Sequence, residues 1–475
     1  MSRMIVISNR VAAPTQGGAG SQGGLAVAIA AALKEYRGMW FGWSGERIAE
    51  YTGAISIARH DGVTTATIDL EEQDVDEYYN GYANKTLWPL FHYRLDLVEF
   101  DRAFGAGYAR VNQRFADAVA PLIEPDDLVW IHDYHLIPLA RELRARGLKN
   151  RIGFFLHTPW PPARLLATLP QHEELVQCLM TYDLIGFQTE DWLDSFRAYI
   201  LGQVGGSESD GVFTAYGASV RAGVFPIGID AEAFIAAAHG PEADAAHDRI
   251  VHSIAGRKML VGVDRLDYSK GIEDRFLAYE RLLTDHPEWI GRAFLLQIAP
   301  PTRAGIGSYQ DIRERLDALS GRINGAFADV DWVPLRYVNR AYPRGELAGI
   351  YRAATAALVT PLRDGMNLVA KEYVAAQDPD DPGVLILSKF AGAATQMGSA
   401  LLVNPFDGQD MMEAMDRALT MPLAERKERW TELYDGVRQD DVLAWREHYI
   451  AALQETPSQQ GPWPSAAAPV QGQPA

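Results

Sequence analysis

Cysteine and long apolar runs are nearly absent from this chain of 475 residues. The single thiol, Cys178, excludes an intrachain disulfide and fits a reducing compartment. The apolar run at residues 4–7 is too short for a signal peptide. The longest run, residues 25–33, is far short of the roughly 20 residues that a membrane span needs. We therefore expect a cytoplasmic protein with no membrane partner.

Positive charge is also scarce, because 44 Lys and Arg residues face 62 Asp and Glu residues and leave a net charge of −18. A surface of this sign repels nucleic acid, so we expect no nucleic-acid partner. If the ligand is itself an anion, the basic residues that hold it must form local islands in an acidic protein. Each Arg or Lys that follows a predicted strand is therefore informative.

Strand and helix patterns alternate along most of the chain. Apolar, β-rich runs lie at residues 4–8, 39–43, 127–133, 151–157, 183–188 and 224–229, and again at 258–266, 293–300, 329–335, 356–362, 383–388 and 400–406. Nearly continuous apolar strands in β-α-β order predict parallel sheets covered on both faces by helices. The chain is too long for one core. Six runs on each side of residue 230 predict an α/β protein of two doubly wound domains that face each other across a cleft.

The domain boundaries follow from this pattern. We expect a first domain at residues 1–228 and a second at residues 229–455, with the last helix of the second domain able to pack back on the first. Residues 456–475 are rich in Pro, Ala and Gln and carry no charged side chain. Such a segment has too little apolar surface to form a core, so we expect a disordered tail there.

In open parallel sheets, ligands bind at the carboxyl ends of strands. The segment "WIHDYH" (130–135) ends one predicted strand with His132, Asp133 and His135, and "FFLHTPWPP" (154–162) ends the next with His157. Four such groups at neighbouring strand ends favour a functional site. Zinc is one alternative, although no fourth ligand has convincing spacing. A hydrogen-bonded core histidine is the alternative for His157.

Basic residues follow the first strands of the second half. The segment "VDRLDYSKG" (263–271) places Arg265 and Lys270 between a strand and a helix that Gly271 opens. Two cations at such a turn predict a phosphate clamp, whereas either one alone would more often be a solvated surface group. Arg303 follows the next strand in the same way.

The stretch "TPLRDGMNLVAKEYVAAQ" (360–377) runs from a buried strand into a helix. Its loop presents Asp364 and successive backbone N–H groups at the helix start, where a pyrophosphate suits the helix dipole. Glu372, one turn in, is placed to bind the vicinal hydroxyls of a ribose. The alternatives are a helix N-cap for Asp364 and an exposed helical acid for Glu372.

Residues 18–23 match the pattern G-x-G-x-x-G, but about ten residues separate them from the preceding strand. With Glu46 as a ribose acid, a nicotinamide dehydrogenase is an alternative function. Gly23 and Gly24 at a helix start could instead offer N–H groups to a phosphate or a sugar hydroxyl. A flexible glycine loop is the third interpretation.

One segment, residues 76–93, is dense in aromatic side chains. Packing is the usual role of such residues, but a ring with a polar tip also suits a sugar, so we expect one or two to contact a ligand. The aromatic residues of this segment are Tyr78, Tyr79, Tyr82, Trp88, Phe91 and Tyr93.

These segments together resemble one family. The resemblance is carried by "SNR" (8–10), "GGL" (23–25), "DEYYN" (76–80), "LWPLFHYRLD" (87–96), "WIHDYHL" (130–136), "RIGFFLHTPWP" (151–161), "RLDYSKG" (265–271) and residues 360–377. The chain is similar, from residue 2 to about 455, to the α,α-trehalose-phosphate synthases. These are retaining glycosyltransferases of family 20 with the GT-B fold of two Rossmann-like domains.

The resemblance implies transfer of glucose from UDP-glucose to glucose 6-phosphate, which gives trehalose 6-phosphate and UDP without a metal ion or other cofactor. It implies catalytic roles for Asp133, His157, Arg265, Lys270 and Asp364. The family's acceptor-binding residues fall on Arg10, Tyr79, Trp88, Asp133 and Arg303. Its donor-binding residues fall on Gly23, Gly24, His157, Arg265, Lys270, Tyr342, Asp364, Gly365, Met366, Asn367, Leu368, Val369 and Glu372.

Two positions depart from the family pattern. Tyr342 stands where the family has Phe in the base pocket, and "HTPWPP" differs from the expected "HIPFP". The first departure leaves the donor base open, with GDP- and ADP-glucose as alternatives to UDP-glucose. A cyclitol donor and a non-catalytic sugar-phosphate sensor on the same fold are further alternatives.

Acidic pairs could suggest a metal-dependent transferase or a covalent intermediate. The D-x-D matches at Asp74 and Asp76 and at Asp329 and Asp331 are interpreted as chance, because the first lies in a helical stretch that points the two carboxylates apart. No carboxylate pair stands out as a nucleophile, so we expect retention by front-face attack. We also expect a homo-oligomer, a dimer or a tetramer.

Overall fold

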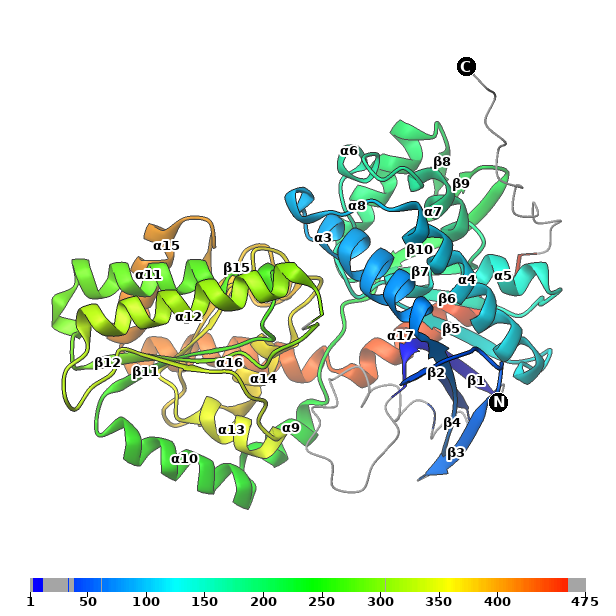
Figure 1. Cartoon of the computed structure of the whole chain (residues 1–475). Coiled ribbons are helices and arrows are strands. Elements are labelled where there is room, and N and C mark those ends of the chain that lie inside the picture. The colour runs from blue at the N-terminus through cyan, green and yellow to red at the C-terminus, as the bar shows by residue number, and fades with distance from the viewer. Residues whose placement is uncertain (1–2, 12–32, 34–37, 61, 304, 460–475) are drawn as a thin grey trace.

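The computed structural model describes residues 3–11, 33, 38–60, 62–303 and 305–459. Two α/β domains lie side by side, each built on one twisted sheet (Figure 1). The first sheet has the strand order β3-β4-β2-β1-β5-β6-β7-β10-β9-β8. Its strands are β1 (Met4–Arg10), β2 (Met39–Ile48), β3 (Ser56–His60), β4 (Val63–Glu71), β5 (Leu128–His132), β6 (Ile152–Phe155), β7 (Leu184–Phe187), β8 (Ser207–Ser209), β9 (Val212–Ala215) and β10 (Ala218–Val224).

The second sheet has six strands in the order β13-β12-β11-β14-β15-β16, and all of its pairings are parallel. The order reverses direction between β11 and β14, so the carboxyl ends of these two neighbours form a switch point at which ligands bind in such sheets. The strands are β11 (Lys258–Val263), β12 (Ala293–Ile298), β13 (Leu335–Val338), β14 (Ala356–Val359), β15 (Val384–Ser388) and β16 (Leu401–Val403).

The prediction of two doubly wound α/β domains is confirmed, but three details are wrong. The apolar run at 224–229 begins where β10 ends, at Val224. The first sheet has ten strands rather than six, and it is mixed, because β3–β4 and β8–β9–β10 pair antiparallel. These outer strands are partly exposed, so they lack the continuous apolar run of a strand buried on both faces. In the second sheet, the apolar run at 329–335 precedes the strand, which begins at Leu335.

Helices cover both faces of each sheet. In the first domain they are α2 (Glu72–Asp74), the π-helix η1 (Val75–Leu87), α3 (Trp88–Phe91), α4 (Arg102–Val119), α5 (Leu139–Ala145), α6 (Ala163–Leu166), α7 (His172–Leu179) and α8 (Glu190–Ala198). In the second they are α9 (Ala231–Ala238), α10 (Pro241–Ile254), α11 (Ile272–Asp285), α12 (Gly307–Phe327), α13 (Arg344–Arg352), α14 (Leu368–Ala376), α15 (Gly408–Thr420) and α16 (Leu423–Gln439). Helices α11, α12 and α15 pack on one face of the second sheet, and helices α9, α13, α14 and α16 pack on the other.

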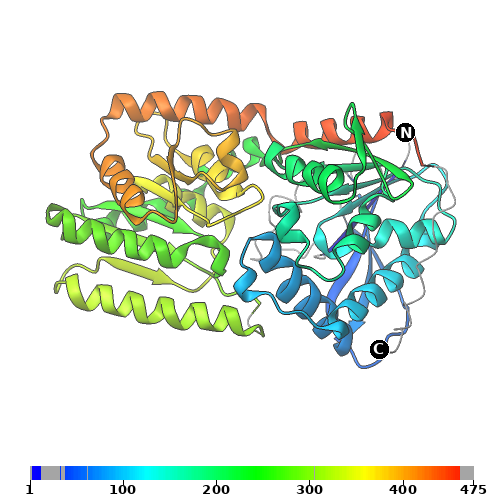
Figure 2. The ribbon, with the colours of Figure 1, turned by 90° about the horizontal axis from the view of Figure 1, so that it is seen from above.

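The last helix, α17 (Val442–Glu455), continues from α16 across to the first domain (Figure 2). The side chain of Asp441 caps it by accepting a hydrogen bond from the N–H of Ala444 at 2.8 Å. The ring of Tyr449 stacks on Trp130 of β5 with centroids 4.6 Å apart, and its hydroxyl donates to the carbonyl of Phe154 at 3.0 Å. Aromatic burial therefore attaches the end of the chain to the first sheet.

Residues 457–459 follow α17 along the first domain, where the N–H of Gln459 donates to Asp183 Oδ1 at 2.7 Å. The rest of the predicted tail lies outside the described residues. None of the helices in the described part of the chain is both long and apolar enough to cross a membrane.

Candidate active site

Side chains from the strand ends of both domains converge at one place. Asp133 and His157 follow β5 and β6 of the first sheet, whereas Arg265 and Asp364 follow β11 and β14 of the second. The guanidinium of Arg265 lies 5.6 Å from the ring centroid of Trp88, which belongs to the first domain. The predicted strand-end residues therefore face one another across the domain boundary.

The backbones of the two domains approach each other closely at Gly365. A Cβ atom at this position would lie 1.8 Å from the carbonyl oxygen of His157. Only glycine permits this approach. A hydrogen bond between the domains reinforces it, because the indole N–H of Trp192 donates to the carbonyl of Gly365 at 3.4 Å. The loop before α14 is thus positioned by the first domain as well as by its own.

Arg303 is the most enclosed cation of the site. Its guanidinium lies 4.0 Å from the ring centroid of Trp88, and it donates to the hydroxyls of Tyr309 at 2.5 Å and Tyr134 at 3.3 Å. Asp267 lies 3.6 Å from it and is fully buried. Aromatic faces and hydroxyls hold a guanidinium in one orientation, so this Arg is pre-organised for an anion.

The local charge balance around Asp267 is positive. Burial alone would raise the pKa of this carboxyl, but the charges of Arg303, Arg265 and Lys270 outweigh burial and lower its pKa to about 2. Three cations thus share one buried carboxylate in a protein whose net charge is −18. This is a local basic island of the kind that an anionic ligand requires.

Arg10 and Tyr79 lie against a shared neighbour. Arg10 ends β1, is exposed, and has its guanidinium 5.7 Å from the ring centroid of Trp43. Tyr79 meets the same indole edge to face at 5.6 Å and stacks on His135 at 6.0 Å. The hydrophobic core of the first domain includes three other aromatic residues of segment 76–93, namely Tyr78, Tyr82 and Phe91.

Asp133 has a strained backbone, with φ 75° and ψ 163° in a region that favours glycine. Its N–H donates to the carbonyl of Phe155 at 2.8 Å, and its carboxylate accepts from the N–H of His157 at 3.4 Å. Burial raises the pKa of Asp133 to about 6, against the lowering effect of the N–H groups of Tyr134 and His157 and of the charges of Arg303 and Arg265.

His157 is neutral at physiological pH, because burial lowers its pKa to about 3. Its Nε2 lies 3.1 Å from Nδ1 of His132, whose pKa burial also lowers. One ring must donate and the other must accept in this contact. The pair is not itself a cation, so positive charge at the site comes from Arg and Lys.

Lys270 and Asp364 form an ion pair between the two loops of the second sheet. Asn367 Nδ2 donates to the same carboxylate oxygen of Asp364 at 3.1 Å. Helix α14 starts at Leu368 with Asn367 as its N-cap, at φ 76°, so Asp364 is not the cap. The Asn367 side chain makes no capping bond to α14, which leaves first-turn N–H groups for a ligand.

Further along α14, Glu372 is partly buried, and burial raises its pKa to about 7 against the opposing charge of Arg344. An exposed helical acid would not behave in this way. Tyr342 is also partly buried, and the guanidinium of Arg340 lies 4.5 Å from its ring centroid. Met366 is buried, whereas Leu368 and Val369 open the helix and are partly exposed.

Gly23, Gly24 and the whole G-x-G-x-x-G match at 18–23 lie outside the described residues. Glu46, proposed with them as a ribose acid, ends up on β2, where its carbonyl accepts from the indole N–H of Trp43 at 2.8 Å.

The acidic pairs are engaged elsewhere. Asp74 is fully buried in ion pairs with Arg110 and Arg114. Asp331 is exposed and pairs with Arg257 at 2.9 Å. The first pair directly follows β4, but Asp74 is already occupied by its two Arg partners, and the second pair precedes β13.

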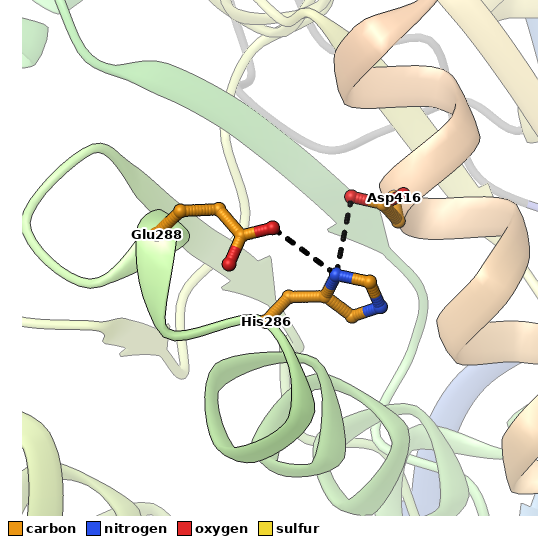
Figure 3. A group of neighbouring side chains, drawn as sticks. All are labelled: His286, Glu288 and Asp416. Atoms are coloured by element: carbon orange, nitrogen blue, oxygen red, sulfur yellow. Dashed lines mark hydrogen bonds and ion pairs between the residues drawn. The ribbon is translucent and has the colours of Figure 1, made fainter.

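Among the described residues, one group of three side chains has ligand atoms close enough to hold a metal ion: His286, Glu288 and Asp416 (Figure 3). His286 Nδ1 lies 3.2 Å from Glu288 and 3.9 Å from Asp416. Asp416 also accepts a bond from Trp289 Nε1 at 2.8 Å. The group lies between the ends of α11 and α15, at the amino edge of the sheet, and its contacts are those of a surface ion-pair cluster.

A cavity of about 230 Å³ lies at the same amino edge, opposite the converging strand ends. Its cations are Lys258, Arg352 and Arg426. Each donates to a main-chain carbonyl, those of Leu419, Ala238 and Pro382 respectively. These cations thereby satisfy carbonyl groups at helix ends and in a turn that have no backbone partner, which is a structural role.

Several residues of the site escaped the sequence analysis. Tyr134, Asp267 and Tyr309 surround Arg303, although the first two sit inside quoted segments. Arg363 also lies in a quoted segment, and its guanidinium lies 3.8 Å from the ring centroid of Tyr93 in the other domain. Only the strand-end position of these segments could have drawn attention to them, because their partners are distant in sequence.

Comparison with known proteins places this geometry. The sequence model of glycosyltransferase family 20 matches residues 5–455. A trehalose-6-phosphate synthase of Sinorhizobium fredii is 49% identical over 456 residues, which cover 95% of this chain and 98% of that protein.

Two solved structures are also similar. An α,α-trehalose-phosphate synthase (UDP-forming) from Burkholderia xenovorans, in complex with glucose-6-phosphate, is 48% identical with a TM-score of 0.92, over 95% of this chain and 100% of that one. A structure from E. coli bound with UDP-2-fluoro glucose is 46% identical with a TM-score of 0.92, over 96% and 100%. The chain belongs to glycosyltransferase family 20.

Proposed function

We propose that this chain transfers glucose from UDP-glucose to glucose 6-phosphate with retention, giving α,α-trehalose 6-phosphate and UDP. The observation that carries the proposal is the convergence of Arg265, Lys270 and Arg303 with Asp133 and His157 where the two domains meet. Two relatives of the same family and fold carry a nucleotide-sugar analogue and glucose-6-phosphate, the two substrates of this reaction.

The donor diphosphate belongs at the second domain. Arg265, Lys270 and the N–H groups that begin α14 supply positive potential where charge develops as the bond from the sugar to UDP breaks. Glu372, when ionised, accepts hydrogen bonds from the ribose hydroxyls, and Asp364 binds hydroxyls of the transferred glucose. Gly365 to Val369 provide the backbone that approaches the donor, with Tyr342 at the base. The family resemblance adds Gly23 and Gly24 to the donor-binding residues.

The acceptor belongs between the domains. Arg303 and Arg10 bind the 6-phosphate, Tyr79 contacts the sugar, and Trp88 contributes through the guanidinium of Arg303 that it holds. Asp133 accepts a hydrogen bond from a sugar hydroxyl at the reacting end. The acceptor's attacking hydroxyl gives its proton to the departing phosphate as the new bond forms on the face that UDP leaves.

Front-face attack is preferred because neither candidate nucleophile is free to form a covalent sugar ester. Asp364 is paired with Lys270. The carboxylate of Asp133 accepts a hydrogen bond from the N–H of His157. A glycosyl-enzyme trapped at either carboxylate would refute this route.

Positive side chains and helix N–H groups can stabilise the leaving group without a metal ion, so we propose that the reaction needs no metal or other cofactor. We further propose that the enzyme acts in the cytoplasm as a homo-oligomer, a dimer or a tetramer, and that the domain boundary falls between residues 228 and 229.

An end-point assay tests the proposal. The protein is incubated with glucose 6-phosphate and, separately, UDP-, GDP- or ADP-glucose, in the presence of EDTA, and both released nucleotide and disaccharide phosphate are measured. We expect turnover with UDP-glucose. Donor binding without turnover would favour a sugar-phosphate sensor or a cyclitol-using enzyme, and binding of NADH alone would favour the dehydrogenase.

A further inference from the structure

Lys371 is a buried cation that none of the proposed catalytic steps uses. It lies on α14, next to Glu372, and its side chain is almost completely inaccessible. Its Nζ donates to the carbonyl of Ile227 at 2.9 Å and to Oε1 of Gln396 at 2.8 Å. A buried charge is costly unless it is bonded in this way, so its position calls for an explanation.

One partner of Lys371 lies in a segment where the chain crosses between the domains, and the other partner is bonded to the second such segment. Ile227 lies in the first crossing, residues 225–230, between β10 and α9. Gln396 Nε2 donates to Asp440 at 2.8 Å, and Asp440 lies in the second crossing, between α16 and α17. One lysine therefore connects the donor helix to both crossings, directly to the first and through Gln396 to the second.

The two crossings also touch each other. The N–H of Val442 donates to the carbonyl of Ile229 at 3.0 Å. A Cβ atom at Gly228 would lie 2.2 Å from the carbonyl oxygen of Asp440, so only glycine permits the contact. The crossings thus form one compact hinge, defined here as residues 225–230 and 440–442, and relative motion of the domains must pass through it.

We propose that Lys371 is a positioning residue that ties the donor helix α14 to the interdomain hinge, so that Asp133 and His157 of the first domain meet a donor held by the second in one fixed geometry. This inference rests on the proposed function. It assigns Lys371 no contact with substrate. Burial lowers the pKa of Lys371 to about 8 and the charge of Asp440 opposes this shift, so the amine is mostly protonated at neutral pH and can donate to both partners.

The expected effect separates positioning from binding. Lys371→Met removes both bonds but leaves Glu372 and the start of α14 intact, so the dissociation constant for UDP should change by less than about threefold. Because misplacement of the reacting groups by about 1 Å can cost about 100-fold, kcat should fall by about 10- to 100-fold. KM for glucose 6-phosphate should rise, because its binding groups come from both domains.

A matched control is Lys258→Met. Lys258 also donates to a main-chain carbonyl, that of Leu419, but it lies at the amino edge of the second sheet, away from the hinge. It should lose thermal stability with kcat unchanged. A second variant, Gln396→Met, keeps the bond from Lys371 to Ile227 and breaks only the link to Asp440. It should lose less activity than Lys371→Met, and the double variant should be no worse than Lys371→Met alone.

Hydrogen exchange supplies a readout that does not depend on turnover. Amides of residues 225–230 and 440–442 should exchange faster in Lys371→Met and Gln396→Met than in the wild-type protein, and should be unchanged in Lys258→Met. Unchanged exchange at the hinge, equal losses of UDP affinity and kcat, or multiplicative losses in the double variant would each overturn the proposal. Failure of the wild type to bind UDP or turn over would instead refute the proposed function, while the exchange result would still decide the role of Lys371 at the hinge.

Discussion

The backbone and the charge of Asp133 both work against folding, so changing this residue should raise stability while abolishing activity. Its φ of 75° and ψ of 163° lie in a region that costs a non-glycine residue about 1–3 kcal/mol. Its carboxyl is buried, which raises its pKa to about 6. Asp133→Asn removes the charge, and Asp133→Gly removes the charge and the strain.

The charge term depends on pH. Because the pKa rises from 3.8 to about 6, the penalty is absent below about pH 4, grows as pH rises and is complete above about pH 6. At about 1.4 kcal/mol per pKa unit, it reaches at most about 3 kcal/mol. The strain term is independent of pH, and the backbone entropy of glycine offsets about 0.5–1 kcal/mol of it, which leaves a further gain of about 1 kcal/mol for Asp133→Gly.

Thermal unfolding followed by calorimetry between pH 4.5 and pH 7.5 checks both terms. For a domain of this size, 1 kcal/mol shifts Tm by about 2–4 °C. The Tm of Asp133→Asn should therefore exceed that of the wild type by several degrees at pH 7.5 and by little at pH 4.5. The Tm of Asp133→Gly should exceed that of Asp133→Asn by about 2–4 °C at both pH values. Transfer to glucose 6-phosphate should be lost in both variants. A gap between Asn and wild type that does not change with pH, or a Gly variant less stable than the Asn variant, would refute the reasoning.

Other residues of the site give further expectations. Lys270→Met should lower kcat/KM by about 100- to 1000-fold in steady-state assays, because it removes the cation that stabilises the leaving diphosphate and the ion-pair partner of Asp364. A loss below tenfold would contradict this role. Since burial raises the pKa of Glu372 to about 7, the fraction of this carboxyl that is ionised increases as the pH rises. UDP affinity measured calorimetrically should therefore increase from pH 6 to pH 8, and it should stay constant over this range in Glu372→Gln. Arg303→Lys should raise KM for glucose 6-phosphate about tenfold or more without weakening the binding of UDP, because an ammonium cannot replace a planar guanidinium stacked on Trp88. An equal loss of affinity for both ligands would argue against an acceptor role.

How much of the fold could be predicted depended on burial. The central strands of both sheets are apolar on both faces, so their sequences are continuous runs that stand out without any alignment. The four strands without a predicted counterpart are β3, β4, β8 and β9. They are partly exposed, and each pairs antiparallel with a strand next to it in sequence. None of them carries a continuous apolar run, so the sequence pattern predicts six strands where the structure has ten.

The site was predictable in its strand-end members and not in its partners. Asp133, His157, Arg265 and Asp364 each follow a recognisable strand, and parallel strands deliver such residues to the same edge. That Arg303 lies over Trp88, or that Arg363 lies over Tyr93, is a relation between the two domains. No local pattern carries it, because it depends on how the two finished sheets are oriented.

Composition, strand periodicity and the polar residues after each strand determined the α/β class, the presence of two domains and the phosphate-binding chemistry, since these follow from local preferences and from the direction of parallel strands. The tertiary structure alone decided which groups are buried and which meet. Lys371 reads as an ordinary helical lysine in the sequence, yet packing encloses it and aims it at Ile227 and Gln396. Burial and orientation arise only when distant segments pack, so the pKa values of Asp133 and Glu372 and the link from α14 to the hinge are properties of the folded chain.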